Sequence, residues 1–201
     1  MRRMKALLVL VALLYVGSYV AGWYLISIKS AIAVEISQGL QESILTEQPF
    51  TLIFQSLQGG ELLKAILVTF LVNLTMGAFL TTTLPGIVPL VGLLGTVAIT
   101  LLRGFVVGIT YPEVLSSSPA VFTLGLGTLI LELGAYVFSG AAGINIALAP
   151  VLLSRYGAQS RLAALRTAWK DAARVYLIVV VLLALGAAWE MTGLFLVLRS
   201  T

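Results

Sequence analysis

The stretch AVFTLGLGTLILELGAYVFSGAAGINIALAPVLL, residues 120–153, decides how this chain is organised. It is apolar over 34 residues and carries a single charged side chain, Glu132. Because a membrane span needs roughly 20 apolar residues, the stretch is too long for one ordinary crossing. Its segment Ser139–Gly143, SGAAG, combines weak helix formers with small side chains that allow close backbone approach. We therefore expect either one span followed by a short broken or re-entrant helix, or two short spans.

Three stretches before it and one after it are each long enough for one complete span. They are Ala6–Ile28, Leu62–Thr82, Gly86–Thr110 and Val175–Leu198. The first ends in Trp23 and Tyr24, aromatic residues typical of a membrane interface, and it is too long for a cleaved signal peptide. Pro85 and Pro89 place a turn between the second and third spans, which should form an antiparallel hairpin. A loop is expected over Tyr111–Pro119.

The composition of the whole chain is typical of a membrane protein. Hydrophobic residues make up 60% of the 201 residues and charged residues only 10%, whereas ordinary globular domains carry about a quarter charged residues. A hydrocarbon solvent removes the need for a polar surface, and spanning helices satisfy their own backbone hydrogen bonds. We expect an all-α, polytopic transmembrane helix bundle in the cell membrane, forming one domain over residues 1–201.

The distribution of charge predicts the topology. Basic residues gather at the N-terminus, as Arg2, Arg3 and Lys5, and again between residues 155 and 174. Acidic residues gather instead in and beside the loop after the first span. The positive-inside rule therefore places both basic regions in the cytoplasm. An even number of crossings between them means that residues 120–153 cross once, which gives five crossings in total and an outer C-terminus.

A first amphipathic helix is predicted over residues 31–46. Ile32, Ile36, Leu40 and Ile44 repeat every four residues, while polar side chains fall largely on another face. This pattern is typical of a helix that lies along the membrane surface.

A second, basic amphipathic helix is predicted over residues 160–174. Its apolar stripe consists of Leu162, Leu165, Trp169, Ala172 and Tyr176. One interpretation is an interfacial helix that anchors the topology. The other is a docking surface for a cytoplasmic protein partner, formed by Arg161, Arg166, Trp169, Lys170 and Arg174.

Four polar side chains lie inside the predicted spans: Asn73, Arg103, Glu132 and Glu190. An ionisable group in the hydrocarbon costs roughly 2.5–3.5 kcal/mol on insertion scales, so each needs a partner or a role. Because their predicted depths are similar, we expect the four to meet inside the bundle. The meeting point is either a buried ion pair or triad that sets helix register, or a polar cavity that binds a solute or relays protons. Glu190 could instead reach the outer interface beside Trp189.

Two pairs of glycines lie within the spans. Gly104 and Gly108 form a GxxxG pair, and Gly140 and Gly143 belong to the small-residue segment described above. We expect all four to serve helix packing, because glycine lets two backbones approach closely.

The chain contains no histidine and no cysteine. This excludes a His general base, a Cys nucleophile, a disulfide framework and thiolate metal sites. The only aspartate, Asp171, lies in the basic segment, which also excludes an intramembrane aspartyl dyad. Glu132 and Glu190 alone could act as acid or base on a lipid, which is the least favoured reading. We expect no enzymatic activity, no cofactor, no metal ion and no nucleic-acid partner.

Several short motifs resemble those of the stage II sporulation protein M family. Residues 70–73, FLVN, are similar to its Phe-x-x-Asn-Asn motif, with Leu74 in place of the second Asn. Residues 103–108, RGFVVG, are similar to its Asn-Gly-x-x-x-Gly element, with Arg103 in place of Asn.

The later motifs follow in the family's order. Residues 132–135, ELGA, followed by SGAAG at 139–143, look like its Glu-x-x-Ala and Ala-Gly-Ala-Ala-Gly elements. Thr128 and Leu129 stand where the family usually has His-Gly, which removes any role of that His. Residues 187–192, AAWEMT, are similar to its closing Ala-x-Ile-Glu-x-x-Thr-Pro.

The resemblance covers about residues 65–195 and implies a polytopic membrane protein with about five spans. In spore formers the named member joins an engulfment complex with cell-wall hydrolases. The small soluble loops, the missing catalytic groups and the basic helix favour a non-enzymatic membrane scaffold or assembly component. The intramembrane arginine and glutamates support the alternative of a transporter or permease component. The expected partners are the lipid bilayer, proteins at the basic helix, and further copies of the chain in a homo-oligomer.

Overall fold

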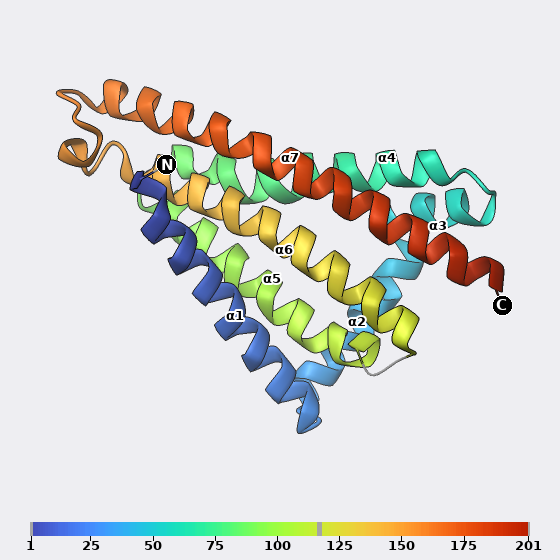
Figure 1. Cartoon of the computed structure of the whole chain (residues 1–201). Coiled ribbons are helices and arrows are strands. Elements are labelled where there is room, and N and C mark those ends of the chain that lie inside the picture. The colour runs from blue at the N-terminus through green and yellow to red at the C-terminus, as the bar shows by residue number, and fades with distance from the viewer. Residues whose placement is uncertain (1, 116–117, 201) are drawn as a thin grey trace.

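The computed structural model describes residues 2–115 and 118–200, and this described part is helical without a strand (Figure 1). Five helices are long and apolar enough to cross a membrane: Lys5–Ser27, Leu62–Ile87, Val91–Pro112, Pro119–Leu148 and Arg161–Arg199. The predicted all-α bundle with five spans is confirmed. The cytoplasmic position of the N-terminus stays a prediction.

The elements follow one another with short connections. The α-helices of the five spans are α1 (Lys5–Ser27), α4 (Leu62–Val72), α5 (Val91–Leu115), α6 (Pro119–Leu148) and α7 (Arg161–Ser200). The elements outside the spans are η1 (Arg2–Met4), α2 (Ala31–Thr46), α3 (Phe50–Gln58) and η4 (Leu153–Tyr156). The α2 helix covers the predicted residues 31–46, whereas α3 was not predicted.

The second span is composite. The α4 helix continues as a π-helix, η2 (Asn73–Thr83), and ends in a 3-10 turn, η3 (Leu84–Ile87). The third span therefore begins at Val91 and not at Gly86 as predicted, because the second span extends through Ile87. The turn between them includes Leu90, whose φ is 61°.

The bundle has the shape of a wedge (Figure 1). The spans converge at the end that carries the N-terminus and diverge toward the other end, where α2 and α3 run from the end of α1 to the start of α4. We call these the narrow end and the splayed end. The core lies mainly toward the narrow end, where α6 packs against α1, α5 and α7.

The predicted break in residues 120–153 is wrong, because α6 is one continuous helix that ends at Leu148. Its segment Ser139–Gly143 is fully buried in the core instead of interrupted. A Cβ atom on Gly143 would lie 3.1 Å from Thr96 Oγ1 and would clash with the Thr82 carbonyl oxygen. The small residues therefore let neighbouring backbones approach α6, which is the alternative use of glycine in a membrane helix.

The predicted separation between a basic helix at 160–174 and a last span at 175–198 is also wrong. Residues 161–200 form one helix, α7, because no Gly or Pro interrupts the sequence between Arg161 and Leu185. At about 1.5 Å per residue its 40 residues extend about 60 Å, twice the roughly 30 Å of a bilayer core. Alanines at 164, 168 and 172 pack against the core, so the basic segment is an extension of the bundle.

Close packing of α1 on α5 depends on the GxxxG glycines of α5. A Cβ atom on Gly104 would lie 2.7 Å from the Tyr15 carbonyl oxygen, and one on Gly108 would lie 2.9 Å from the Trp23 backbone nitrogen. Both distances are too short for a side chain, so glycine is needed at both positions for the observed approach of the two helices.

Candidate functional site

The four polar residues predicted to meet come from four different elements. Asn73 begins the π-helix η2, Arg103 lies midway along α5, Glu132 lies midway along α6, and Glu190 lies in the C-terminal part of α7. All four side chains are half-buried. The structure brings three of them to one cavity, and it directs Arg103 toward another set of partners.

Glu132 is held by an amide. Asn73 Nδ2 donates a hydrogen bond to Glu132 Oε1 at 2.6 Å, which links the second and fourth spans across 59 residues of sequence. Since the amide donates through its nitrogen, the Asn73 carbonyl oxygen remains an acceptor. We call Asn73, Glu132 and Glu190 the carboxylate site.

Arg103 makes no ion pair with either glutamate within the described part of the chain. Its guanidinium donates to Thr82 Oγ1 at 2.7 Å, to the Gly77 carbonyl oxygen at 2.7 Å and to Thr81 Oγ1 at 2.6 Å. The same group lies 4.4 Å from the centre of the Tyr136 ring, a cation–π contact. The predicted ion pair or triad is therefore wrong, because the η2 segment satisfies the arginine.

The π-helix explains how η2 supplies these acceptors. In a π-helix each N–H bonds to a carbonyl five residues back, which alters the register of the side chains and of the carbonyl groups. Thr82 Oγ1 donates to the Gly77 carbonyl oxygen at 2.7 Å, so hydroxyl and carbonyl together face Arg103. Three consecutive threonines at 81–83 were the sequence signal for such a polar surface inside a span.

Three neighbouring cavities border the carboxylate site. The α3 cavity, about 270 Å³, is lined by Asn73, Glu132 and Glu190 and by apolar side chains of α3 and α7. The α2 cavity, about 460 Å³, contains Glu190 in its lining, and the α5–α6 cavity, about 300 Å³, contains Arg103 and Glu132. The two glutamates therefore lie between hollow regions of the fold rather than in a filled core.

The cavities also involve residues that the sequence did not single out. The α3 helix contributes Phe50, Ile53 and Phe54 to the α3 cavity, and Pro49 directly before the helix lines it as well. The apolar spacing of three and four residues in α3 was a helical signal. Tyr111 lines the other two cavities. It was predicted to begin a loop over Tyr111–Pro119, which contains two prolines and three serines, but α5 continues to Leu115.

Two hydroxyl groups in these linings have no hydrogen-bond partner. Thr69 lines the α3 cavity and is 5% exposed, and Thr128 lines the α2 cavity and is 2% exposed. Each Oγ1 atom is buried without a partner in the protein. A buried polar atom of this kind costs free energy unless something outside the chain satisfies it. Within the described residues the chain therefore leaves both hydroxyls unsatisfied beside these cavities.

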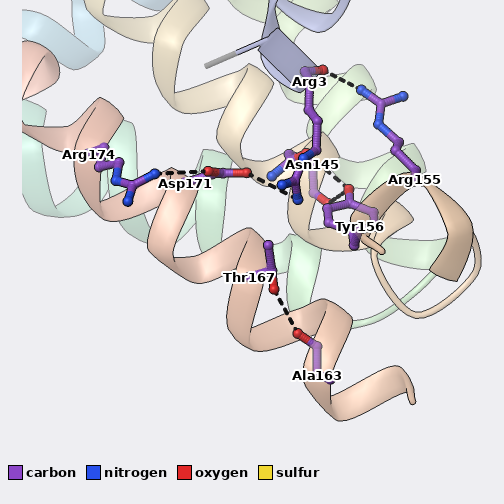
Figure 2. Close-up of polar contacts among 8 residues, drawn as sticks. All are labelled: Arg3, Asn145, Arg155, Tyr156, Ala163, Thr167, Asp171 and Arg174. Carbon is purple, nitrogen blue, oxygen red and sulfur yellow. Dashed lines mark hydrogen bonds and ion pairs between the residues drawn. The ribbon is translucent and has the colours of Figure 1, made fainter. Parts of the chain in front are cut away.

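A second polar cluster lies at the narrow end (Figure 2). Asp171 is between two arginines, with Arg3 Nη1 at 3.9 Å from Oδ2 and Arg174 Nη1 at 3.7 Å from Oδ1. Arg155 Nη2 donates to the Arg3 backbone oxygen at 2.5 Å. We call these four residues the narrow-end cluster, and its carboxylate has cations on both sides.

Beside the narrow-end cluster, Tyr156 forms hydrogen bonds to α6. Its hydroxyl lies 2.6 Å from the Asn145 carbonyl oxygen and 2.9 Å from Asn145 Oδ1 (Figure 2). Burial raises the pKa of the Tyr156 phenol, so the group stays protonated and remains a donor. The contact joins the 3-10 turn η4 to the end of α6.

The residues predicted to form a docking surface divide into two groups. Arg161, Arg166, Lys170 and Arg174 are exposed along the N-terminal part of α7. Trp169 packs instead against the core, beside Ala168 and Ala172. The surface left for a partner is therefore basic, with little of the predicted aromatic contribution.

The sequence profile of one family, stage II sporulation protein M, matches residues 7–192. The match covers most of the chain, and the chain therefore belongs to that family. Neither the curated proteins nor the solved structures contain a match.

Proposed function

We propose that this member of the stage II sporulation protein M family is the membrane component of a transporter, with its solute site at Asn73, Glu132 and Glu190. The observation that carries the proposal is that both glutamates border cavities while the intramembrane arginine bonds elsewhere. Transporters tend to bind their substrates near the middle of the membrane, beside irregular helices. Asn73 is the first residue of such an irregular segment.

Charge balance supports this reading. An isolated charge at the bilayer centre costs roughly 2.5–3.5 kcal/mol on insertion scales. At the narrow end, beside the N-terminus, Asp171 has arginines on both sides. No cation of the described residues lies within ion-pair distance of the carboxylate site. A proton or a bound cation would balance the charge of these carboxyl groups, and a transport site can exchange either one.

Water access to the α3 cavity tests the proposal. The natural chain has no cysteine, so single-cysteine variants report one position each. Thr69→Cys places a thiol in the lining of the α3 cavity, and Leu67→Cys, two residues away, places one on a half-exposed surface position outside the three cavities. A membrane-impermeant maleimide should label the first variant and not the second, because the reagent needs water around the thiol.

The labelling is done on sealed vesicles of each orientation, so that the accessible side is identified. Both variants must label fully after denaturation, which shows that each thiol is present and free. Because Thr69 is buried, Val72→Cys, a half-buried position in the same lining, is labelled in parallel, and if both variants resist the reagent from both sides, the cavity is sealed and the transport proposal fails.

A scaffold or assembly role is the second candidate. It is favoured by the exposed basic side chains along the N-terminal part of α7, which extends beyond the end of α6. A basic helical surface can bind an acidic partner through charge complementarity. Affinity purification at native expression should then recover partner proteins, and their loss from a variant with Arg166 and Lys170 changed to glutamate would assign them to this surface. Recovery of the chain alone would count against the role.

A further inference from the structure

We propose that the carboxylate site binds a small organic cation, an ammonium group carried on an apolar body. The inference rests on the proposed transport function and names the chemical class of the solute. Its first support is the polarity of the lining. Glu132, Glu190 and the free carbonyl oxygen of Asn73 are hydrogen-bond acceptors, and an ammonium group has donors only.

The unpartnered hydroxyls extend this acceptor set. Thr69 Oγ1 and Thr128 Oγ1 are buried in the linings of the α3 and α2 cavities without a partner. A hydroxyl oxygen can accept a hydrogen bond from an ammonium group, although a carboxylate is the stronger acceptor. An anionic solute would instead face two glutamates with no cation in the linings of these two cavities.

The remaining walls fit an apolar body. Phe50, Glu190 and Leu194 line both the α3 and the α2 cavity, so the two share a boundary at the acid. Phe54, Ile53 and Met191 complete the apolar side of the α3 cavity. The α2 cavity, about 460 Å³, is within the range of roughly 300–1,000 Å³ typical of small-molecule sites, and the α3 cavity, about 270 Å³, is just below that range. Aromatic faces beside a carboxylate also stabilise an ammonium group.

A bare metal ion fits these walls less well. The described residues contain no group of three or more acidic, His or Cys side chains close enough to hold one ion. Hard cations also prefer a shell of about six oxygen ligands, which a largely apolar cavity does not offer. A proton alone would leave the apolar space and both hydroxyls without a role.

The test uses three probes of one shape and different charge: 2-phenylethylammonium, 2-phenylethanol and phenylacetate. Each is titrated calorimetrically into the full chain in phosphatidylcholine nanodiscs. The ammonium probe should bind, and the neutral and anionic probes should bind about tenfold more weakly or not at all, as expected for losing a hydrogen bond between charged groups. Equal binding of the three probes, or no binding of the ammonium, would overturn the inference.

Site variants locate the binding. Glu132→Gln and Glu190→Gln keep the side-chain shape, and each should lower the affinity for the ammonium probe about tenfold or more. Glu35→Gln, at an exposed position on α2, is the matched control and should leave binding unchanged. Unchanged binding in both site variants would contradict the assignment. A second measurement avoids the acids altogether: the ammonium probe, but not the alcohol, should slow maleimide labelling of the Thr69→Cys variant.

Two further arms separate the causes of failure and the source of the amine. If the maleimide reaches the Thr69→Cys variant but no ammonium binds, the organic-cation inference fails while the transport proposal stands. If the thiol is also unreachable, both fail. Repeating the titration in nanodiscs that contain phosphatidylethanolamine shows whether a lipid headgroup competes: weaker apparent binding identifies a lipid amine, and unchanged binding identifies a soluble one.

Discussion

At the narrow end of the wedge, helices touch through small residues and the carboxylate of Asp171 lies between two arginines, whereas midway along the spans the carboxyl groups of Glu132 and Glu190 border cavities. Asp171 lies between Arg3 and Arg174 at 3.9 and 3.7 Å. Glu132 has an amide partner at 2.6 Å and a cavity on either side. In one region the carboxylate is paired by side chains of the protein, and in the other, under the proposed function, it remains accessible to a solute.

The difference teaches how to separate a structural charge from a functional one in a membrane bundle. A buried charge that holds the fold together is paired by the chain itself, because breaking such a pair costs several kcal/mol. A carboxylate left for a solute keeps its acceptors free and faces a space that the chain does not fill. Arg103 belongs to the first kind, since the η2 segment satisfies it with backbone and hydroxyl oxygens.

The largest loss of stability is expected from adding a side chain to the closely packed helices of the narrow end. Gly143→Ala adds a Cβ atom that clashes with the Thr82 backbone, and overpacking of this kind should destabilise the fold by about 3 kcal/mol or more. Gly17→Ala is the control, because a Cβ atom there meets nothing within 4 Å. Thermal unfolding of both variants in detergent measures the difference. Equal stability of the two would show that α6 does not need its glycine for close packing.

A smaller loss of stability is expected from Arg103→Lys, because Arg103 lies between the close-packed core and the carboxylate site. A lysine ammonium cannot reach all the oxygens that the planar guanidinium contacts, so we expect a loss of about 2 kcal/mol. Arg166→Lys, at an exposed position, should change the unfolding temperature little. Binding of the ammonium probe should persist in the Arg103→Lys variant. Loss of binding without loss of stability would instead place Arg103 in the solute site.

Removing the narrow-end carboxylate should cost less. Asp171→Asn leaves Arg3 and Arg174 without their anion, and because Arg174 is largely exposed we expect a loss of about 1–2 kcal/mol. Glu61→Gln breaks the exposed pair with Lys64, which should be worth about 0.5 kcal/mol or less. Chemical denaturation of the two variants gives the comparison. A larger loss for Glu61→Gln would reverse the distinction drawn between paired and surface charges.

The smallest effect on stability is expected inside the α3 cavity. Thr69→Val removes a hydroxyl that has no hydrogen-bond partner, so the free energy of unfolding of the ligand-free protein should change by about 0.5 kcal/mol or less. Thr82→Val removes a hydroxyl bonded to Arg103 and Gly77 and should cost about 1–2 kcal/mol. Binding of the ammonium probe should weaken in the Thr69→Val variant although its stability does not. A large stability loss in that variant would mean that the hydroxyl serves the fold.

Much of the fold could be predicted from local signals, and the errors have a common origin. Span number followed from hydrophobic length and charge, and α2 followed from its four-residue repeat. The errors at Ser139–Gly143 and between 160–174 and the last span came from interpreting polarity or small residues as helix ends. In a membrane bundle small residues serve packing as often as they interrupt helices.

The carboxylate site was only partly within reach of the sequence. Asn73, Glu132 and Glu190 could be named because ionisable or amide groups in a span are costly. The partners of Arg103 could not, because they depend on the π-helical register of residues 73–83. The α3 lining was missed as well, since a short apolar helix carries no sign of which cavity it covers.

By itself the sequence determined five apolar helices, a basic N-terminus and basic α7, and a small set of polar residues at mid-span, because hydrophobicity and length act locally along the chain. Only the tertiary structure decided which of those polar residues meet. Side-chain direction in a bundle depends on helix rotation and on the close approach that glycine permits, and both are set by contacts between distant segments. For this chain that decision separated Arg103 from the two glutamates and left the acids beside open space.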